Sequence, residues 1–551
     1  FSLPLRMVRT NKAKAADGLV SELIAKSRLV VPGHVDPDLG EFRTDSPTTQ
    51  PLAVGVTCTI AASMGWAAWT FDVQTAFLSG RSTERQIFIR APKEGLPAVA
   101  GQEKVQPGQL LQILKSAYGL TEAPRLWYLQ AKDLMEKAGL EELNCAKATF
   151  VKRDARGQLL AVCCLHVDDG LLVGSRHDPA FKQTKRAIDR VFSIKEWKDV
   201  QASAEGVPYL GMRCRQDDAC HITLDMDEYV QALEPVKCPR SVEEDAQLSE
   251  PELKGYRSAL MKLAWPARHT LPQLMYGQSR LAQNVTKATW GDVKVLNALI
   301  RSAKVETREG RSAMRFPAIR LDAARVVTSF DASFGKEVGL KSQSGFVTMI
   351  TDSGIDRERT PVAIVEFGSN RIQRVVRSTM AAESAAMSIA LDRHLYARVL
   401  LQAILHGEPA YDGDWRKGIR VPGEVRTAFK QGGLATPGGL VTDAKAVFDH
   451  MSKTGGVPTE RQVTLDLLAA KEMTETGLVR MFWVPSACQL ADSLTKGMTK
   501  SALHDLMSTG SYSLSQTPQQ QQEESHRAAL HKAQRSRRRL RLKEEQSTSS
   551  S

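Results

Sequence analysis

Hydrophobic residues in the first part of the chain change from helical to strand-like spacing. Between Ala53 and Ala68 they recur at the spacing of a helix, and the apolar run Trp69–Phe77 that follows is typical of a buried strand. A loop containing Pro and Gly, residues 91–108, then leads into a second ordered block at residues 110–138. This pattern predicts mixed helices and strands.

The clearest local signal is a pair of apolar runs, Ala161–Val167 and Leu171–Val173, on either side of Asp168-Asp169-Gly170. An Asp-Gly step between two apolar runs is typical of a tight hairpin. We therefore expect a hairpin that holds two adjacent carboxylates at its tip.

The second half of the chain begins with a polar, acidic stretch that contains two prolines, residues 238–253, which predicts a linker. Residues 256–305 then show the spacing of amphipathic helices, and an α/β unit is predicted from about residue 319. Its elements are predicted at Val326–Phe330, Gly345–Ile350 and Val362–Phe367 for strands and at Met380–Leu401 for a helix. An inserted loop is predicted at residues 406–438 and a disordered Gln- and Arg-rich tail at residues 516–551.

Composition narrows the class of protein. The 551 residues are 42% hydrophobic, which is enough for two or three domains that each bury a core. The net charge is +12, and the tail from residue 516 supplies +4 of it, so residues 1–515 are basic on their own. An excess of Lys and Arg fits a nucleic acid partner, although net charge alone also fits proteins that bind none.

The eight cysteines show no CxxC pair and no zinc-type spacing with His, so we expect reduced, mostly buried thiols in an intracellular protein. No apolar run approaches the ~18 residues of a membrane-spanning helix, and residues 1–10 lack the apolar core of a signal peptide. The first residue is Phe, which suggests a piece of a longer protein. The sequence does not distinguish a cytoplasmic particle from the nucleus as its location.

Three acids are candidates for a first metal site. Asp72 lies in the first apolar run, and Asp168 and Asp169 occupy the predicted hairpin tip, so a sheet that pairs these strands would gather all three. A polymerase needs such carboxylates around two divalent ions, one of which activates the attacking hydroxyl. Spacing alone also fits an ordinary strand-end Asp and an acidic turn.

The surrounding motifs favour the polymerase interpretation. Residues 71–80 (FDVQTAFLSG) and 165–169 (LHVDD) resemble the two catalytic motifs of copia-type LTR retrotransposon reverse transcriptases, and residues 114–128 (LKSAYGLTEAPRLWY) resemble the family's nucleotide- and template-contacting motif. The resemblance continues to about residue 500. It implies that Asp72, Asp168 and Asp169 bind metal ions.

The same resemblance implies substrate contacts. Phe77 would lie under the sugar and exclude a 2′-hydroxyl, and Lys26 and Arg28 would grip the triphosphate. Glu122 and Arg125 lie in the nucleotide-contacting motif, where Glu122 replaces the usual Gln. Its added charge would oppose triphosphate binding unless it is protonated or paired, and we expect Lys115 or Arg125 as the partner.

One further departure from the family concerns the second catalytic motif, where His166 replaces the usual Tyr. This side chain can titrate near neutrality beside the two carboxylates.

A second set of acids predicts nuclease chemistry. Asp331, Glu383, Asp443 and Asp492 lie in or beside predicted strands and a helix, where single acids are commonly caps or solvated side chains. Together, residues 329–333 (SFDAS), 342–347 (SQSGFV), 378–383 (STMAAE) and 489–496 (QLADSLTK) resemble the copia-type ribonuclease H domain. The resemblance implies that the four acids bind two metal ions.

The predicted fold is therefore an α+β right-hand polymerase with fingers, palm and thumb, followed by an α/β ribonuclease H-like domain. Its predicted divisions are fingers and palm at residues 1–237, a helical thumb and connection at 238–318, and the ribonuclease H-like domain at 319–505.

The resemblance implies an RNA-directed DNA polymerase with hybrid-cleaving activity and two Mg²⁺ ions per site, with Mn²⁺ as an alternative. The implied partners are an RNA template, a DNA or RNA primer, the RNA–DNA hybrid and deoxynucleotides, with no membrane. The oligomeric state is open. Two other interpretations are a catalytically impaired relic that only binds nucleic acid and an enzyme that keeps only the nuclease. The Arg-rich run 535–541 predicts a nuclear localisation signal, an RNA-gripping arm or a solvated tail.

Overall fold

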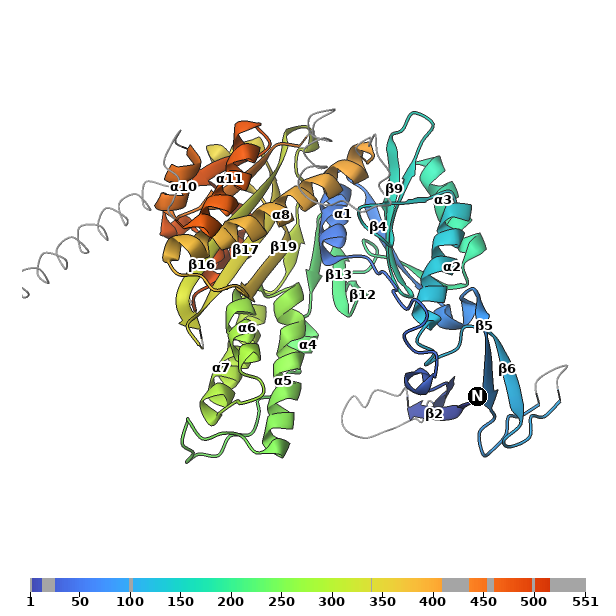
Figure 1. Ribbon diagram of the computed structural model, residues 1–551. Helices are drawn as coiled ribbons and strands as arrows, with labels where there is room; N and C mark the ends of the chain where they lie inside the picture. The colour runs from blue at the N-terminus through green and yellow to red at the C-terminus, as the bar shows by residue number, and fades with distance from the viewer. Residues whose placement is uncertain are drawn as a thin grey trace, which may run out of the picture.

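A computed structural model of the chain describes residues 2–11, 25–98, 103–337, 339–408, 436–452, 460–497 and 501–515. Two arms project from a crosspiece, so the molecule has the outline of a U (Figure 1). Most of the predicted insertion at 406–438 and all of the predicted tail lie outside the described residues.

The first half of the crosspiece is a six-stranded sheet covered on both faces. Its strands are, in spatial order, β11 (Ile194–Asp199), β4 (Ala67–Val73), β10 (Asp169–Gly174), β9 (Leu159–His166), β8 (Thr149–Arg153) and β7 (Glu141–Glu142). Helices α2 (Ala123–Lys137) and α3 (Pro179–Val191) pack on one face, and α1 (Pro51–Ser63) packs on the other. Burial on both faces explains the continuous apolar runs of β9 and β10.

Strand β4 ends earlier than the apolar run predicts. It stops at Val73, and Thr75 adopts a left-handed φ of 51°, which turns the chain into the short 3₁₀ helix η2 (Ala76–Ser79). Phe77 therefore lies on a turn and not in a strand. The prediction was wrong here because apolar side chains of the turn also pack into the core, so the run continues past the strand.

The predicted hairpin is present as β9 and β10, but its turn is shifted. Asp169 pairs with His166, so the two turn residues are Val167 and Asp168. Gly170 lies within β10, where a Cβ would come within 2.1 Å of the Phe71 ring. The glycine is thus required by close packing across the sheet and not by the turn.

The two arms differ in secondary structure. One arm is built from strands: β1 (Leu3–Pro4), β5 (Ser82–Arg90) and β6 (Leu110–Lys115), with the hairpin β2 (Arg6–Asn11) and β3 (Ala25–Val30). The other is built from the predicted helices: α5 (Glu250–His269), α6 (Met275–Gln283) and α7 (Trp290–Arg308). Capping boxes, in which Ser249 and Glu252 or Thr289 and Asp292 bond reciprocally, begin α5 and α7.

The second half of the crosspiece is the predicted α/β unit. Its strands are, in spatial order, β19 (Ala363–Arg371), β17 (Lys341–Asp352), β16 (Ala324–Glu337), β20 (Gly438–Thr442) and β21 (Arg480–Trp483). The pairs β16–β20 and β20–β21 are parallel and the other two are antiparallel. Helix α8 (Thr379–His406) packs on this sheet with α11 (Arg461–Glu475) beside it.

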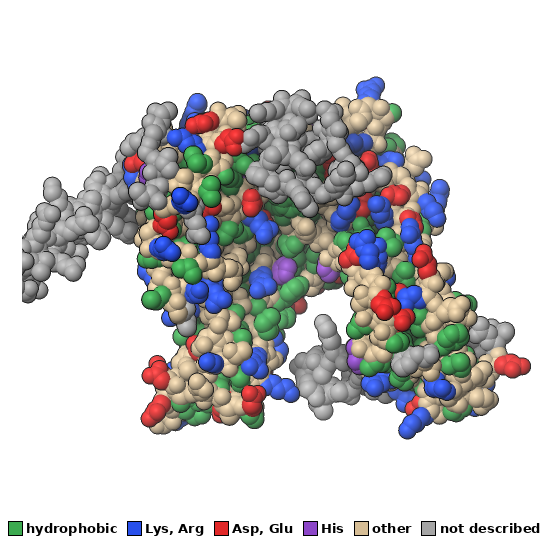
Figure 2. Space-filling model, in the orientation of Figure 1, with side chains coloured by type: hydrophobic (Ala, Val, Ile, Leu, Met, Phe, Trp, Pro, Cys, Tyr) green, Lys and Arg blue, Asp and Glu red, His purple; other side chains and the backbone are tan. Residues whose placement is uncertain are grey.

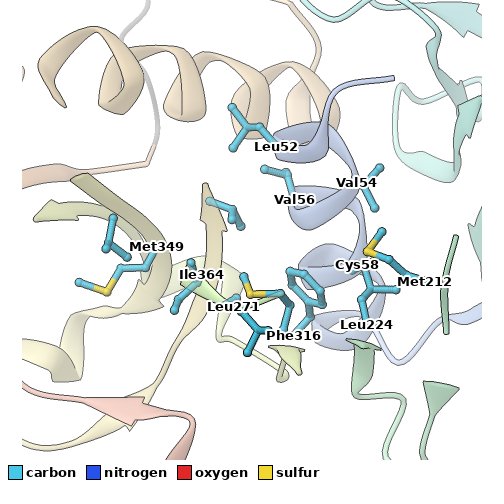
Figure 3. Packing of buried hydrophobic residues seen from close by; sticks show 14 of the residues in the cluster. Leu52, Val54, Val56, Cys58, Met212, Leu224, Leu271, Phe316, Met349 and Ile364 are labelled. Carbon is cyan, nitrogen blue, oxygen red and sulfur yellow. The ribbon is translucent and has the colours of Figure 1, made fainter. Parts of the chain in front are cut away.

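A shared core joins these regions. Helix α1 lies between the two halves of the crosspiece and packs against β19, while β15 (Met314–Phe316) joins a sheet with β12 (Val207–Tyr209), β13 (Met212–Gln216) and β14 (Ile222–Asp225). Figure 3 shows Val56 and Cys58 of α1 in one apolar cluster with Met212, Phe316 and Ile364. Residues from all three predicted divisions therefore share one core, and the division boundaries stay a prediction.

Two predictions from composition concern the cysteines and the membrane. None of the eight cysteines belongs to a disulfide and five of them are buried, as expected. Among the described residues, no helix combines the length and the apolar character needed to cross a membrane.

Candidate active sites

The first carboxylate cluster lies where β4, β10 and the β9–β10 turn meet. Asp72 and Asp169 are directly opposite each other in the antiparallel pair, and Asp168 is the second residue of the turn. Burial raises the pKa of Asp168 and of Asp169, and the neighbouring carboxylates raise both further. The structure thus brings the three predicted acids together, and their role as metal ligands stays a prediction.

Basic side chains face this cluster. His166 opposes the rise in pKa at Asp168 and at Asp169, and Lys26 of β3 does so at Asp168. His166 also lies near His269 at the end of α5, because it contributes to the lowered pKa of that histidine. The crosspiece carries the cluster, which lies near Lys26 of one arm and His269 of the other, so it is at the base of the hollow between the arms that Figure 2 shows.

The turn that carries Asp168 is held in an unusual conformation. Val167 has a φ of 57°, which is a rare backbone conformation for a β-branched residue. The indole N–H of Trp127 donates a hydrogen bond to the Val167 carbonyl at 2.7 Å, and the Val73 N–H donates to the Asp168 carbonyl at 2.9 Å. Helix α2 and strand β4 thereby hold the turn in place, as expected where backbone strain occurs at a functional site.

Phe77 and Arg28 both lie against one tyrosine, Tyr118. The Phe77 and Tyr118 rings are in edge-to-face contact, with their centres 6.2 Å apart. The Arg28 guanidinium lies 5.8 Å from the centre of the Tyr118 ring. The Val31 N–H donates to the Tyr118 carbonyl at 2.7 Å, which joins the end of β3 to this segment. The structure therefore places Arg28 and Phe77 in one region, and the strand that carries Arg28 also carries Lys26.

The predicted partners of Glu122 are wrong. Its carboxylate accepts a 2.7 Å hydrogen bond from Thr83 and lies 3.6 Å from Arg85, and Glu122 is 7% exposed. Arg125 instead bonds Asp45 at 2.7 Å. The sequence did not reveal Arg85 because it belongs to β5, which pairs with β6 only in the folded chain.

A pocket beside the first cluster contains residues that the sequence did not single out. Asp72 and Asp169 line it together with Lys195 and Lys198 of β11 and the Leu210-Gly211 turn. The register of β11 on β4 shifts between Ile194 and Trp197, so two residues, Lys195 and Glu196, lie opposite Asp72. Such bulges redirect side chains next to active sites, and only the strand pairing reveals this one.

The second carboxylate cluster is tighter and more deeply buried. Asp331 lies within β16, Asp443 follows β20, and Asp492 lies in a short 3₁₀ helix at Leu490–Leu494. One carboxylate oxygen of each lies within 4.8 Å of the others, and Asp331 is 1% exposed. The prediction that Asp331 follows its strand was wrong, because β16 continues to Glu337 through a segment in which polar and small residues interrupt the apolar pattern.

Glu383 completes this cluster from the buried side of α8. Burial raises the pKa of Glu383, and the charges of Asp331 and Asp443 raise it further. Its Oε2 atom is buried and has no hydrogen-bond partner in the described part of the chain. Four carboxylates with an unsatisfied oxygen form the donor set that a hard divalent ion such as Mg²⁺ prefers, so these residues fit the predicted metal.

Neighbouring side chains orient the second cluster. Gln489 is 1% exposed, and its amide donates to the Phe330 carbonyl at 3.0 Å and to Asp443 at 3.5 Å. Ser486 donates to Asp443 at 2.5 Å. On the other side, Thr495 donates to Asp331, and the ammonium of Lys496 contacts both Asp331 and Asp492. Burial disfavours the charged ammonium, but the surrounding carboxylates raise the pKa of Lys496 overall.

Comparison with known proteins agrees with this arrangement. Residues 2–236 match the family model for reverse transcriptase (RNA-dependent DNA polymerase). The N-terminal part of the chain is thus similar to reverse transcriptases. The chain is also similar to the retrovirus-related Pol polyproteins of two Arabidopsis thaliana transposons, RE2 and RE1. The chain is 27% identical to RE2 over an alignment that covers 50% of this chain and 19% of RE2. It is 23% identical to RE1 over an alignment that covers 88% of this chain and 30% of RE1.

The predicted resemblance to copia-type Pol polyproteins is therefore confirmed, and the chain spans less than a third of the length of these two relatives. Among solved structures, a foamy viral protease-reverse transcriptase in complex with dsDNA is similar with a TM-score of 0.44 and 11% identity, covering 88% of this chain and 77% of that one. A ribonuclease H1 of Halobacterium salinarum is similar with a TM-score of 0.19 and 19% identity, covering 33% and 98%. The observed order, a six-stranded sheet with two arms followed by a mixed five-stranded α/β sheet, agrees with the predicted fold class.

Proposed function

We propose that the chain is the RNA-directed DNA polymerase of a copia-type retrotransposon and that it also cleaves the RNA strand of RNA–DNA hybrids. The observation that carries this proposal is the presence of two separate carboxylate clusters, one at the base of the hollow between two arms and one on the α/β sheet. Each cluster contains the kind of carboxylates that its proposed activity requires to bind divalent ions.

At the first cluster, Asp72, Asp168 and Asp169 would hold two divalent ions, with Mg²⁺ the expected species. Bound there, the ions supply Lewis acidity toward the attacking hydroxyl and the triphosphate. Lys26 and Arg28 face this region from β3 and would neutralise triphosphate charge. Phe77 would exclude a 2′-hydroxyl, because its ring is fixed against Tyr118.

At the second cluster, Asp331, Glu383, Asp443 and Asp492 would hold the ions that activate water against an RNA phosphodiester. Gln489 keeps the Asp443 carboxylate oriented, and its buried amide also bonds the Phe330 carbonyl in the middle of β16. The partners of both sites would be an RNA template, a primer, the hybrid and deoxynucleotides.

Glu122 does not favour the impaired-relic interpretation. Its carboxylate points to Thr83 and Arg85, so its negative charge is paired within the arm. One observation favours a nuclease-only enzyme: within the described residues, the second cluster is the only group of at least three potential ligands within 4.8 Å. The nuclease site is thus already gathered, whereas the polymerase acids have to move closer on metal binding.

The test is primer extension on an RNA template with Mg²⁺ and all four deoxynucleotides, with hybrid cleavage measured on the same preparation. The proposal expects both activities in the full chain. Hybrid cleavage without extension, by a folded protein that binds primer–template, would support the nuclease-only interpretation. Loss of both activities in a folded protein would contradict the proposal.

A further inference from the structure

The ammonium group of Lys496 lies inside the second carboxylate cluster. Its Nζ atom is 2.6 Å from Asp492 Oδ1 and 3.3 Å from Asp331 Oδ2. The Lys496 N–H also donates to the Asp492 carbonyl at 2.9 Å, so the side chain starts one turn after the acid that it contacts. A cation of the chain itself therefore lies between two of the four proposed metal ligands.

The cluster is consequently divided into two halves of different charge. Asp331 and Asp492 share the Lys496 ammonium, and Asp331 also accepts from the Thr495 hydroxyl. Asp443, in contrast, has the neutral donors Ser486 and Gln489.

Glu383 belongs to the second half. It is 7% exposed, and its Oε2 has no hydrogen-bond partner among the described residues. A buried carboxylate oxygen without a partner is costly. In the part of the chain that the structure describes, no Lys or Arg forms an ion pair with Glu383 or Asp443.

We propose that Lys496 is a built-in counter-ion that competes with one of the two divalent ions at the ribonuclease site. This inference rests on the proposed ribonuclease function. An ion on the Glu383 and Asp443 side meets the unpartnered Glu383 Oε2 and an Asp443 carboxylate that only neutral groups bond, whereas an ion that uses Asp331 and Asp492 has to displace the ammonium. The 35% exposure of the Lys496 side chain leaves it a route toward solvent when it is displaced.

The competition has a measurable consequence. If the ammonium is displaced in only about one part in ten of the metal-free molecules, the apparent affinity for the second ion is about tenfold weaker than without the lysine. Removing the positive charge should therefore destabilise the metal-free protein, because buried carboxylates lose their counter-ion, and should strengthen metal binding. A purely structural lysine would affect stability alone.

The test is a Mg²⁺ titration that is monitored both by thermal unfolding and by calorimetry. The full chain carries Asp168→Asn and Asp169→Asn so that the first cluster does not contribute. We expect Lys496→Met to lower the Mg²⁺ midpoint about tenfold and Lys496→Arg to keep it. Lys294→Met is the matched control, because Lys294 forms an ion pair with Glu244 away from both clusters and should leave the midpoint unchanged.

Three outcomes separate the possibilities. Lys496→Met could lower the Tm equally with and without Mg²⁺ and leave the midpoint of the Mg²⁺ titration unchanged. This outcome overturns the inference but leaves the ribonuclease proposal intact. Absence of any Mg²⁺ response, together with absence of hybrid cleavage in the Lys496 parent, overturns both. If Lys496→Met and Lys496→Gln do not fold in metal-free buffer, the inference expects saturating Mg²⁺ to restore folding, and failure to do so contradicts it.

Discussion

The two carboxylate clusters use the same kind of side chain in different surroundings. Asp72 and Asp168 are exposed at the base of a hollow, whereas Asp331 and Asp492 are buried and already paired with Lys496. An exposed site can admit a large double-stranded substrate with its triphosphate. A buried site keeps its ligands close without metal, but it needs an internal cation because adjacent desolvated carboxylates repel each other.

The largest expected effect separates the two clusters. Asp168→Asn with Asp169→Asn should reduce extension by about 10³-fold or more and leave hybrid cleavage intact, while Asp331→Asn should do the reverse, because losing metal stabilisation costs several kcal/mol. Extension and cleavage rates of the two variants provide the measurement. Loss of both activities in either folded variant would contradict the assignment of two independent sites.

The next effect concerns the strand-built arm. Arg85 is 18% exposed and bonds Asp36 and Asp38 at 2.8 and 2.9 Å. It also lies close to Glu122 and over the Phe42 ring. Arg85→Met should destabilise the arm by about 3–5 kcal/mol, since buried Asp36 and Glu122 lose their cation.

The measurement for Arg85→Met is denaturant unfolding, and extension should fall while cleavage persists. Arg81→Met is the matched control, because the Arg81–Asp133 ion pair is far more exposed and should contribute only about 0–1 kcal/mol. Similar unfolding midpoints for the two variants would show that the Arg85 network contributes little.

A smaller effect tests how the two clusters are connected. Arg153 of β8 donates to the carbonyls of Ala403, Ile404 and Leu405 at 2.6–3.1 Å, which caps the end of α8. Arg153→Met should cost about 1–3 kcal/mol and lower both activities together at elevated temperature. Arg156→Met, at a nearby exposed position, should have no such effect. A decrease in one activity alone would show that the two halves of the crosspiece act independently.

The smallest effect is expected from Glu122→Gln, which restores the residue usual in the family. The carboxylate is occupied by Thr83 and Arg85, so the change should alter stability by about 1 kcal/mol and the extension rate by less than about threefold. Single-nucleotide incorporation at varied deoxynucleotide concentration measures this. A large gain in apparent nucleotide affinity would instead show that the charge of Glu122 reaches the incoming triphosphate.

Local pattern was sufficient for much of the fold. The spacing of apolar residues predicted α1, the helical arm, the strands of the α/β unit and α8, because these elements bury continuous faces. It failed at element ends. The turn at Thr75 and the polar continuation of β16 beyond Phe330 depend on backbone conformation and strand pairing that a single segment does not reveal.

The sequence by itself indicated which acids belong to each cluster. Specific motifs contain Asp72, Asp168 and Asp169 of the first cluster and Asp331, Glu383 and Asp492 of the second, and Asp443 closes an apolar run. Only the tertiary structure decided what surrounds them. Arg85 as the partner of Glu122, the β11 bulge opposite Asp72 and the ammonium of Lys496 between Asp331 and Asp492 arise from contacts between different elements. Burial and charge pairing depend on those distant contacts, so motif and spacing alone do not determine them.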